Sequence, residues 1–418
     1  MRFTAVLAVV LCVGLVVFPA PARAEKSPVD EVGLDLGVDA IELDDAAESA
    51  APSLARVRAL KAERLARAKM TPTAAAATAK TSVVDCSKGQ SIQAAIDKDV
   101  GPLDIEIKGI CNENVRIERK QVTLRGVDPT LDGIRGVAAT PSVPGLSIFY
   151  SDGVVIQDLS ISDGPAVGVG MFFSQVTMER CRIANNASTG MNVSSASFLN
   201  ALELTISNNV GRGLNVQRGA ITFCTGCTLT DNVSNAAFAT LNGTLTLLDS
   251  AVSGRHGIVA NFGSYADIDC VSSPTTSVTC GMNVTGRAAF ALGGATAALF
   301  GAGDFSGQLI AVDRGLVYLF GARQVAPGTN PGGFPVPNNV GGFGTLQAEP
   351  FVDELDVAHQ SQLKGATGVN TFGRALLLGE TVVDGSLTCE SAGDARADPG
   401  VVVTAGGSII GCEHASAP

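Results

Sequence analysis

The sequence has few aromatic residues and few histidines: its 418 residues include no tryptophan, three tyrosines and three histidines. The core must therefore be built mainly from aliphatic side chains, which are plentiful because 46% of the residues are apolar. Basic residues are also outnumbered, with 29 Lys and Arg against 40 Asp and Glu and a formal net charge of −11. This balance argues against a nucleic-acid binder, which needs a basic surface.

Long apolar runs are missing beyond the N-terminus, so no segment after residue 24 is expected to form a membrane helix. Residues 1–24 have the pattern of a secretory signal peptide: Arg2, an apolar run from Ala5 to Val17, and the small-x-small motif Ala22-Arg23-Ala24. We therefore expect an exported protein that is secreted, periplasmic or held at the cell surface.

Residues 25–81 differ in composition from the rest of the chain and are expected to form a leader and linker. An acidic block between residues 30 and 48 precedes a basic, Ala- and Leu-rich stretch from Leu54 to Met70. That stretch favours a helix, which could bind a membrane surface or a polyanion, or could simply be solvated. We assign residues 82–418 to the main domain.

The main domain contains a repeat of about one coil per 23 residues. One column of aliphatic residues recurs at steps of 22, 23, 23 and 23, namely Ile161, Ile183, Ile206, Leu229 and Val252. Such a period indicates a solenoid, and alternation of apolar and polar residues within each unit predicts short strands rather than helices. We therefore predict a parallel β-helix in which Ile206 points inward between Ile183 and Leu229. The pairs Asn185-Asn186, Asn208-Asn209 and Asp231-Asn232 predict ladders of stacked amides at corners.

Cysteine spacing is typical of an oxidising compartment. Two cysteine pairs are separated by close to one coil, and residues one coil apart stack at roughly 4.8 Å, within the range that a disulfide tolerates. A third pair could close a local loop. The predicted disulfides are Cys86–Cys111, Cys270–Cys280 and Cys389–Cys412.

The number of coils between them also decides how the remaining cysteines of the domain can pair. Cys181 and Cys227 are two coils apart, too far to bridge, so we interpret Cys227 as pairing with Cys224 and Cys181 as a free core thiol. A zinc site at this Cys-x-x-Cys would need a second pair of ligands, which the few histidines do not supply. We predict neither a metal nor a cofactor.

The start of the main domain resembles a known family. Residues 91–97 predict a short helix capped by Ser91. The run from Cys86 through Gln90–Ile96, then Gly109-x-Cys111-x-Glu113-x-Val115-x-Ile117 and Val122–Gly126, resembles the opening coils of pectin-lyase-like right-handed β-helix proteins, pectin methylesterases included. The resemblance implies an all-β fold: a right-handed parallel β-helix solenoid with a short N-terminal capping helix, which would cover otherwise exposed strand edges.

The same resemblance raises three activities. The segment Gly254–Ile258 (Gly-Arg-His-Gly-Ile) resembles the Gly-His-Gly segment of polygalacturonases. Inverting hydrolysis needs two carboxyl groups, however, and one coil upstream, where that family has paired aspartates, the chain has Ser234 and Asn235. Neither the acidic pair and arginine of methylesterases nor the calcium-binding carboxylates of pectate lyases can be found.

Outward-facing residues of one strand column favour binding over cleavage. If Met191 and Leu214 point inward, the neighbouring outward side chains are amides, hydroxyls and one aromatic ring, which suit hydrogen bonding and stacking with sugars. The binding residues that we predict are Asn192, Asn215, Gln217 and Phe238. Arg212, Arg218 and Arg255 could flank this face and attract an acidic glycan, or could be solvated corner residues.

Two functions follow from these patterns. The first is a non-catalytic, exported β-helix that binds extracellular or cell-surface carbohydrate or serves as a surface module, with no nucleic-acid partner. The alternative is a polysaccharide lyase, glycoside hydrolase or esterase. Its candidate catalytic residues, Arg255, His256, Asp267 and Asp269, would have to converge in one groove beside the Pro- and Gly-rich segment 326–344.

Overall fold

The computed structural model describes residues 79–410, except 138–142, 271–279, 301–303, 330–334, 344, 350, 353–357, 360, 370–373, 379–380, 390–393, 398–400 and 405–407. All of these residues belong to one compact unit, Lys61–Pro418. The predicted signal peptide, the leader as far as residue 78, and Cys412 lie outside the described residues.

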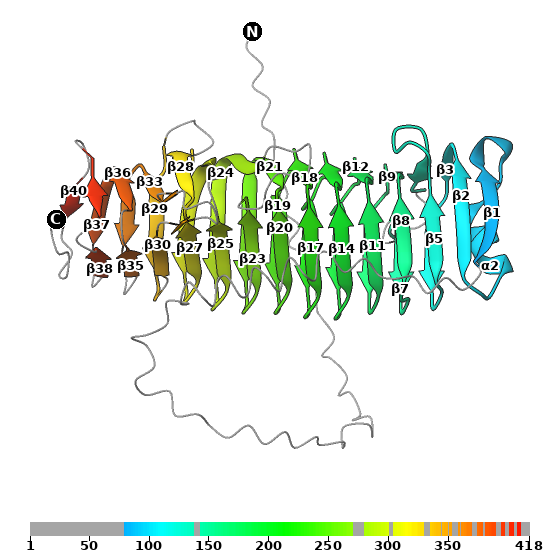
Figure 1. Cartoon of the computed structure of the whole chain (residues 1–418), viewed down its shortest axis with the longest axis horizontal. Helices are drawn as coiled ribbons and strands as arrows, with labels where there is room; N and C mark the ends of the chain where they lie inside the picture. The colour runs from blue at the N-terminus through cyan, green and yellow to red at the C-terminus, as the bar shows by residue number, and fades with distance from the viewer. Residues whose placement is uncertain are drawn as a thin grey trace, which may run out of the picture. The chain divides into compact units, whose positions relative to one another are not determined.

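Most coils contain three short strands joined by corners (Figure 1). In one representative coil these are β11 (Gln175–Glu179), β12 (Arg182–Ala184) and β13 (Met191–Ser194). We call the corresponding stacks of parallel strands the first-, second- and third-strand stacks. Among the described residues, the first forms a 14-stranded sheet and the other two share a 24-stranded sheet. They join at β24 (Gly281–Leu292), which pairs with a strand of each stack.

The strands of the early and central coils have the following bounds. The first-strand stack contains β1 (Lys80–Asp85), β2 (Leu103–Lys108), β5 (Val122–Arg125), β8 (Val154–Gln157), β11, β14 (Phe198–Leu202), β17 (Ile221–Thr225), β20 (Thr244–Leu248) and β23 (Tyr265–Asp269). The second contains β3 (Ile110–Asn112), β6 (Gly133–Arg135), β9 (Ser160–Ser162), β12, β15 (Thr205–Ser207), β18 (Thr228–Thr230) and β21 (Ala251–Gly254). The third contains β4 (Val115–Glu118), β7 (Leu146–Phe149), β10 (Val169–Phe172), β13, β16 (Leu214–Gln217), β19 (Asn235–Thr240) and β22 (His256–Asn261).

Later coils keep this arrangement. Strand β26 (Asp304–Val312) continues from β24, and β28 (Arg323–Ala326) and β29 (Asn338–Gly341) separate the two stacks again. The segment 326–344 is therefore not one long excursion, because β29 returns to the third-strand stack within it. The backbone of Asn338–Gly341 pairs with β26 and β34 (Thr367–Val369).

The aliphatic column predicted from the repeat is confirmed. Ile161, Ile183, Ile206, Leu229 and Val252 are consecutive partners in β9, β12, β15, β18 and β21. All five side chains belong to the single buried core that fills the coil. The strand period therefore places one side of every strand in this core and turns the other outward.

The predicted amide ladder is also present. Nδ2 of Asn186 donates to Oδ1 of Asn209 at 2.9 Å, and Nδ2 of Asn209 donates to Oδ1 of Asn232 at 2.9 Å. The residues before them, including Asn185 and Asn208, have φ of 58° and 55°, a left-handed conformation that Asn tolerates better than most residues. The ladder thus satisfies buried backbone groups at each corner.

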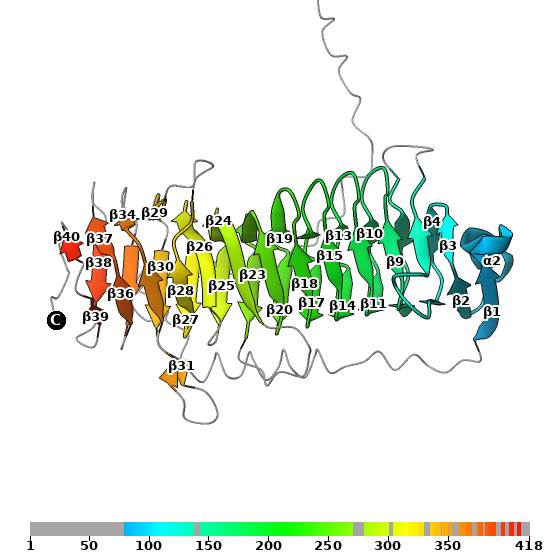
Figure 2. The same cartoon turned by 90° about the horizontal axis from the view of Figure 1, so that it is seen from above.

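The predicted capping helix is α2 (Ile92–Lys98), which lies at the N-terminal end of the coil beside β1 and β2 (Figures 1 and 2). The Ser91 hydroxyl accepts the Ala94 N–H, as expected of an N-cap. The Glu113 carboxylate accepts the N–H groups of Ile92 and Gln93, so the first complete coil holds the helix start in place. Its buried isoleucines, Ile92 and Ile96, close the core.

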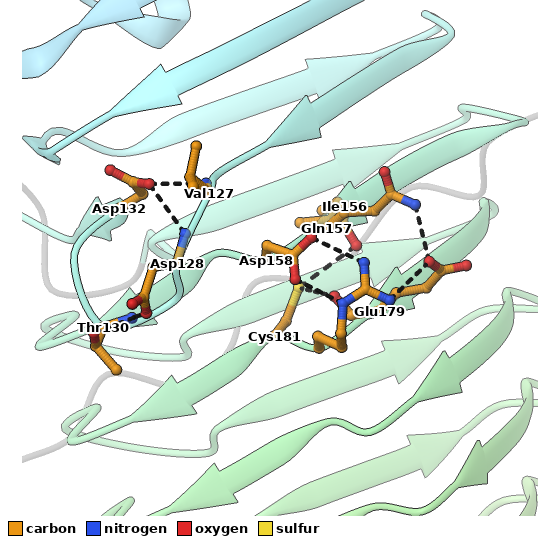
Figure 3. Close-up of polar contacts among 10 residues, drawn as sticks. Val127, Asp128, Thr130, Asp132, Ile156, Gln157, Asp158, Glu179 and Cys181 are labelled. Atoms are coloured by element: carbon orange, nitrogen blue, oxygen red, sulfur yellow. Dashed lines mark hydrogen bonds and ion pairs between the residues drawn. The ribbon is translucent and has the colours of Figure 1, made fainter. Parts of the chain in front are cut away.

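The cysteine predictions hold wherever the structure describes both partners. Within the described residues, disulfides join Cys86 to Cys111, Cys224 to Cys227 and Cys270 to Cys280. Cys389 is disulfide-bonded, and its predicted partner Cys412 lies outside those residues. Cys181 is free and buried, with its Sγ 3.3 Å from the carbonyl oxygen of Glu179 and 3.5 Å from that of Ile156 (Figure 3).

Replacing Ile206 with alanine should lower the free energy of unfolding by about 2–5 kcal/mol, because it leaves a cavity in a fully buried column. Val210→Ala in the same coil is the control: Val210 is 61% exposed, and a surface change costs less than about 0.5 kcal/mol. Urea titrations followed by circular dichroism measure both. Equal effects of the two substitutions would contradict the inward orientation of Ile206.

Cys181 should resist alkylation in the native protein at neutral pH. Burial raises the pKa of its thiol to about 12, and only the thiolate reacts. Iodoacetamide treatment followed by mass spectrometry should label Cys181 in urea without reductant, and should leave Cys86 and Cys111 unlabelled. Labelling of that pair before reduction would show that the first coils are aligned differently.

Candidate functional site

The outer face of the third-strand stack carries the four predicted binding residues. Asn192, Asn215 and Phe238 are consecutive partners in β13, β16 and β19. Gln217 follows Asn215 by two residues and therefore points to the same side. The intervening residues, such as Leu214 and Val216, are in the core. The sequence therefore assigned the orientation of all four side chains correctly.

Three of these side chains form an amide cluster. Nδ2 of Asn215 donates to Oδ1 of Asn192 at 2.7 Å, and Nε2 of Gln217 donates to the same oxygen at 3.1 Å. Asn192 and Gln217 remain partly exposed. Among the described residues no protein group bonds to Nδ2 of Asn192 or to Oε1 of Gln217. The cluster therefore offers one donor and one acceptor, held in place, to a ligand.

Phe238 does not present the open stacking surface that we predicted. The guanidinium carbon of Arg212 lies 3.8 Å from the centre of its ring, and Nη1 of Arg212 is 3.4 Å from Oδ1 of Asn215. The ring is only 7% exposed. Phe238 therefore supports Arg212 by a cation–π contact. Partial burial lowers the pKa of Arg212, which nevertheless remains a cation at neutral pH.

An aromatic ladder lies at the other end of the same face. Phe149 stacks on Phe172 with ring centres 5.1 Å apart, and Tyr150 stacks on Phe173 with ring centres 5.3 Å apart. Tyr150 and Phe173 are 50% and 52% exposed, which is unusual for large apolar rings. We did not predict this ladder, although Phe-Tyr at 149–150 and Phe-Phe at 172–173 recur at one coil spacing.

The backbone of the ladder holds its outer rings toward solvent. Tyr150 and Phe173 have φ of 49° and 50°, a left-handed conformation that is rare for bulky residues and costs about 1–3 kcal/mol each. Arg119 lies 5.3 Å from the centre of the Tyr150 ring on the N-terminal side. On the C-terminal side Phe172 pairs with the small residue Ser194 and then Gln217, so the ladder leads directly to the amide cluster.

His256 lies at the start of β22, opposite Asn235 of the preceding coil. Its Nδ1 accepts the backbone N–H of Arg287 at 3.1 Å, so the proton of the neutral ring is on Nε2. Burial and the positive charges of Arg255 and Arg287 lower the pKa of His256. At neutral pH the ring is therefore a hydrogen-bond donor at Nε2 and cannot act there as a general base.

The four candidate catalytic residues do not meet. Arg255 and His256 are at the start of the third-strand stack, whereas Asp267 and Asp269 lie on β23 in the first-strand stack, on another side of the coil. Asp267 is buried, and its Oδ2 accepts the hydroxyl of Tyr265 at 3.3 Å. The arrangement that the alternative hypothesis requires is therefore absent from the described coils.

Packing explains the glycines of the polygalacturonase-like segment. Gly254 has φ of 117°, a conformation that favours glycine. A Cβ on Gly257 would lie 2.5 Å from the carbonyl oxygen of Ala288 in the next coil. Both positions thus need glycine for backbone reasons.

The described residues hold no group of three or more His, Cys, Asp or Glu side chains placed to bind a metal ion. None of their helices has the length and apolar character needed to cross a membrane.

Residues 107–252 match the family model described as "Right handed beta helix region". This match agrees with the parallel coil described above, and the predicted fold, a right-handed parallel β-helix, is confirmed. No curated protein sequence matches it significantly.

Two solved structures show a weak likeness. The catalytic domain of Agl-KA is 12% identical, with 79% of this chain and 68% of that chain covered and a TM-score of 0.27. The catalytic unit of a GH87 α-1,3-glucanase from Streptomyces thermodiastaticus strain HF3-3 is 15% identical, with coverage of 82% and 71% and a TM-score of 0.26. Likeness at this level carries no information on function.

The purified protein should release no reducing ends from polygalacturonate. An imidazole without carboxylate partners contributes about 10²–10⁴-fold as an acid or base, far below the acceleration that glycoside hydrolysis requires. A reducing-sugar assay with wild type and His256→Ala measures this. Hydrolysis at enzymatic rates that disappears in His256→Ala would contradict the assignment.

Proposed function

We propose that this protein is an exported β-helix that binds extracellular polysaccharide through the outer face of its third-strand stack and does not cleave it. The observation that supports this most strongly is the aromatic ladder, whose half-exposed rings are followed along the same stack by the amide cluster. Exposed rings with fixed hydrogen-bonding groups beside them are the usual components of a sugar-binding surface.

The dimensions of the face fit a chain rather than a single sugar. From β7, at the start of the ladder, to β16, at the end of the amide cluster, the stack advances by three coils, or roughly 14 Å at about 4.8 Å per coil. A polysaccharide that crosses the strands would contact Tyr150 and Phe173 by stacking, and then Asn192 and Gln217 by hydrogen bonds. Such a mode needs no deep pocket.

Export is supported by the signal-peptide pattern and by the disulfides. Cysteines close together in the sequence, such as Cys224 and Cys227, and far apart, such as Cys86 and Cys111, form disulfides. Disulfides persist mainly outside the reducing cytosol. An extracellular or periplasmic polysaccharide would therefore be accessible to the folded protein.

Phe173→Ala should weaken polysaccharide binding about 3–10-fold, because a stacking contact contributes about 0.5–1.5 kcal/mol. Phe343→Ala is a matched control: Phe343 is 62% exposed and has φ of 61°, but it lies in the corner that follows β29, seven coils away from Phe173. Affinity electrophoresis in gels containing β-glucan, mannan, dextran or polygalacturonate measures both.

Equal retardation of Phe173→Ala and Phe343→Ala in every gel that retards the wild type would exclude the ladder from the binding surface. A wild type that none of these polysaccharides retards would count against the proposed function itself.

A further inference from the structure

Beyond the amide cluster, the outer face becomes cationic. Arg212 precedes β16 and reaches over Phe238, and Arg287 in β24 lies with its guanidinium carbon 5.1 Å from the centre of the Phe290 ring. Phe238, Val259 and Phe290 are consecutive partners in β19, β22 and β24. The two guanidinium groups are therefore held over rings two coils apart, roughly 10 Å.

His256 lies between these arginines in the order of coils. In the preceding coil its partner is Asn235. The Asn235 carbonyl in turn accepts the N–H of Gly213, the residue after Arg212, one coil further back. The partner of His256 on the other side is Arg287, whose backbone N–H fixes the imidazole ring. His256 is partly exposed and presents an N–H at Nε2.

These cations have no carboxylate partners, unlike comparable arginines elsewhere in the coil. Arg180 pairs with Asp158 of the preceding coil at 2.7 and 2.9 Å (Figure 3), and Arg323 pairs with Asp304 at 2.8 and 2.7 Å. Within the described residues no Asp or Glu lies within ion-pair distance of Arg212, Arg255 or Arg287. In a chain of net charge −11, a cationic group left unpaired on a face that otherwise carries amides and rings requires an explanation.

We propose that Arg212, His256 and Arg287 bind oxyanion substituents, carboxylates or sulfates, carried by successive sugars of the polysaccharide that the aromatic ladder holds. This inference rests on the proposed function for the identity of the molecule that carries the anion. Each phenyl ring fixes its guanidinium by a cation–π contact and leaves the N–H groups at the edge to the ligand. From β7 to β24 the binding face then advances by six coils, roughly 29 Å.

The surroundings of His256 allow the anion to be detected. The charged groups near it are Arg255 before β22, Arg287 in β24 and Arg212 two coils back, while Asp231, in the corner beneath Gly254, accepts the Thr230 hydroxyl at 3.0 Å. Burial and the charges of Arg255 and Arg287 lower the pKa of the imidazole, and a bound anion must raise it by favouring the protonated ring. By linkage, affinity for the anion must increase as the pH falls through the pKa of His256.

The test uses two pairs of polysaccharides that differ mainly in charge: polygalacturonate with its full methyl ester, and dextran sulfate with dextran. In at least one pair the anionic member should bind about tenfold or more tightly than the neutral one, as charge-assisted hydrogen bonds would give. Arg287→Gln should reduce this preference and Arg212→Gln/Arg287→Gln should abolish it. Arg182→Gln, which changes an exposed arginine of the second-strand stack, should preserve it. The pair that shows the preference identifies carboxylate or sulfate.

A second measurement follows the C–H resonances of His256 by NMR, with His256→Gln for assignment. The anionic ligand, and sodium sulfate at higher concentration, should raise the pKa of His256. Binding that depends on Phe173 but not on charge, or an unchanged pKa with bound polygalacturonate and dextran sulfate, would overturn the inference and leave the proposed function standing. Loss of the Phe173-dependent binding as well would reject both.

Discussion

The constraint on which the whole structure depends is the fixed rise of one coil. Parallel backbone hydrogen bonds hold successive strands about 4.8 Å apart. Side chains of one type that recur at the coil period are therefore nearly in contact. The Cα atoms of Cys86 and Cys111 are 4.9 Å apart, and the rings of the aromatic ladder are 5.1 and 5.3 Å apart. Disulfides, amide ladders, aliphatic columns and ring stacks are four chemical uses of one spacing.

The same rise decides which columns are stable. Amides can stack because each side chain both donates and accepts, as Asn186 and Asn209 do. Cations stacked directly above one another would repel, and several arginines pair instead with a carboxylate of an adjacent coil, as Arg180 does with Asp158. Arg212 and Arg287 are instead three coils apart and are placed over rings two coils apart. This arrangement tolerates two positive charges on one face and keeps them available to a ligand.

The sequence predicted those features that follow from periodicity alone. The column of Ile206, the amide ladder, the disulfides with both partners described and the inward or outward orientation of Asn192 and Gln217 all depend only on counting residues around a coil. The position of Asp267 and Asp269 was not predicted, because a corner separates them from His256 and turns them onto another side of the coil. The predicted role of Phe238 as a stacking surface for sugars was wrong because Arg212 of the preceding coil covers its ring. Strand alternation does not indicate how far a long side chain extends. The aromatic ladder was missed because Phe149 and Tyr150 precede the aligned repeats.

The central claim is that a polysaccharide lies along the third-strand stack from the ladder to the amides, away from the buried carboxylates of β23. Hydroxyl-radical footprinting by mass spectrometry tests it most directly, since half-exposed rings are readily oxidised and a bound chain shields them. With a polysaccharide that retards the protein in gels, oxidation of Tyr150 and Phe173 should fall while that of Phe343, which lies beyond the face, stays constant. Unchanged oxidation at Tyr150 and Phe173, with protection on the first-strand stack instead, would contradict the account.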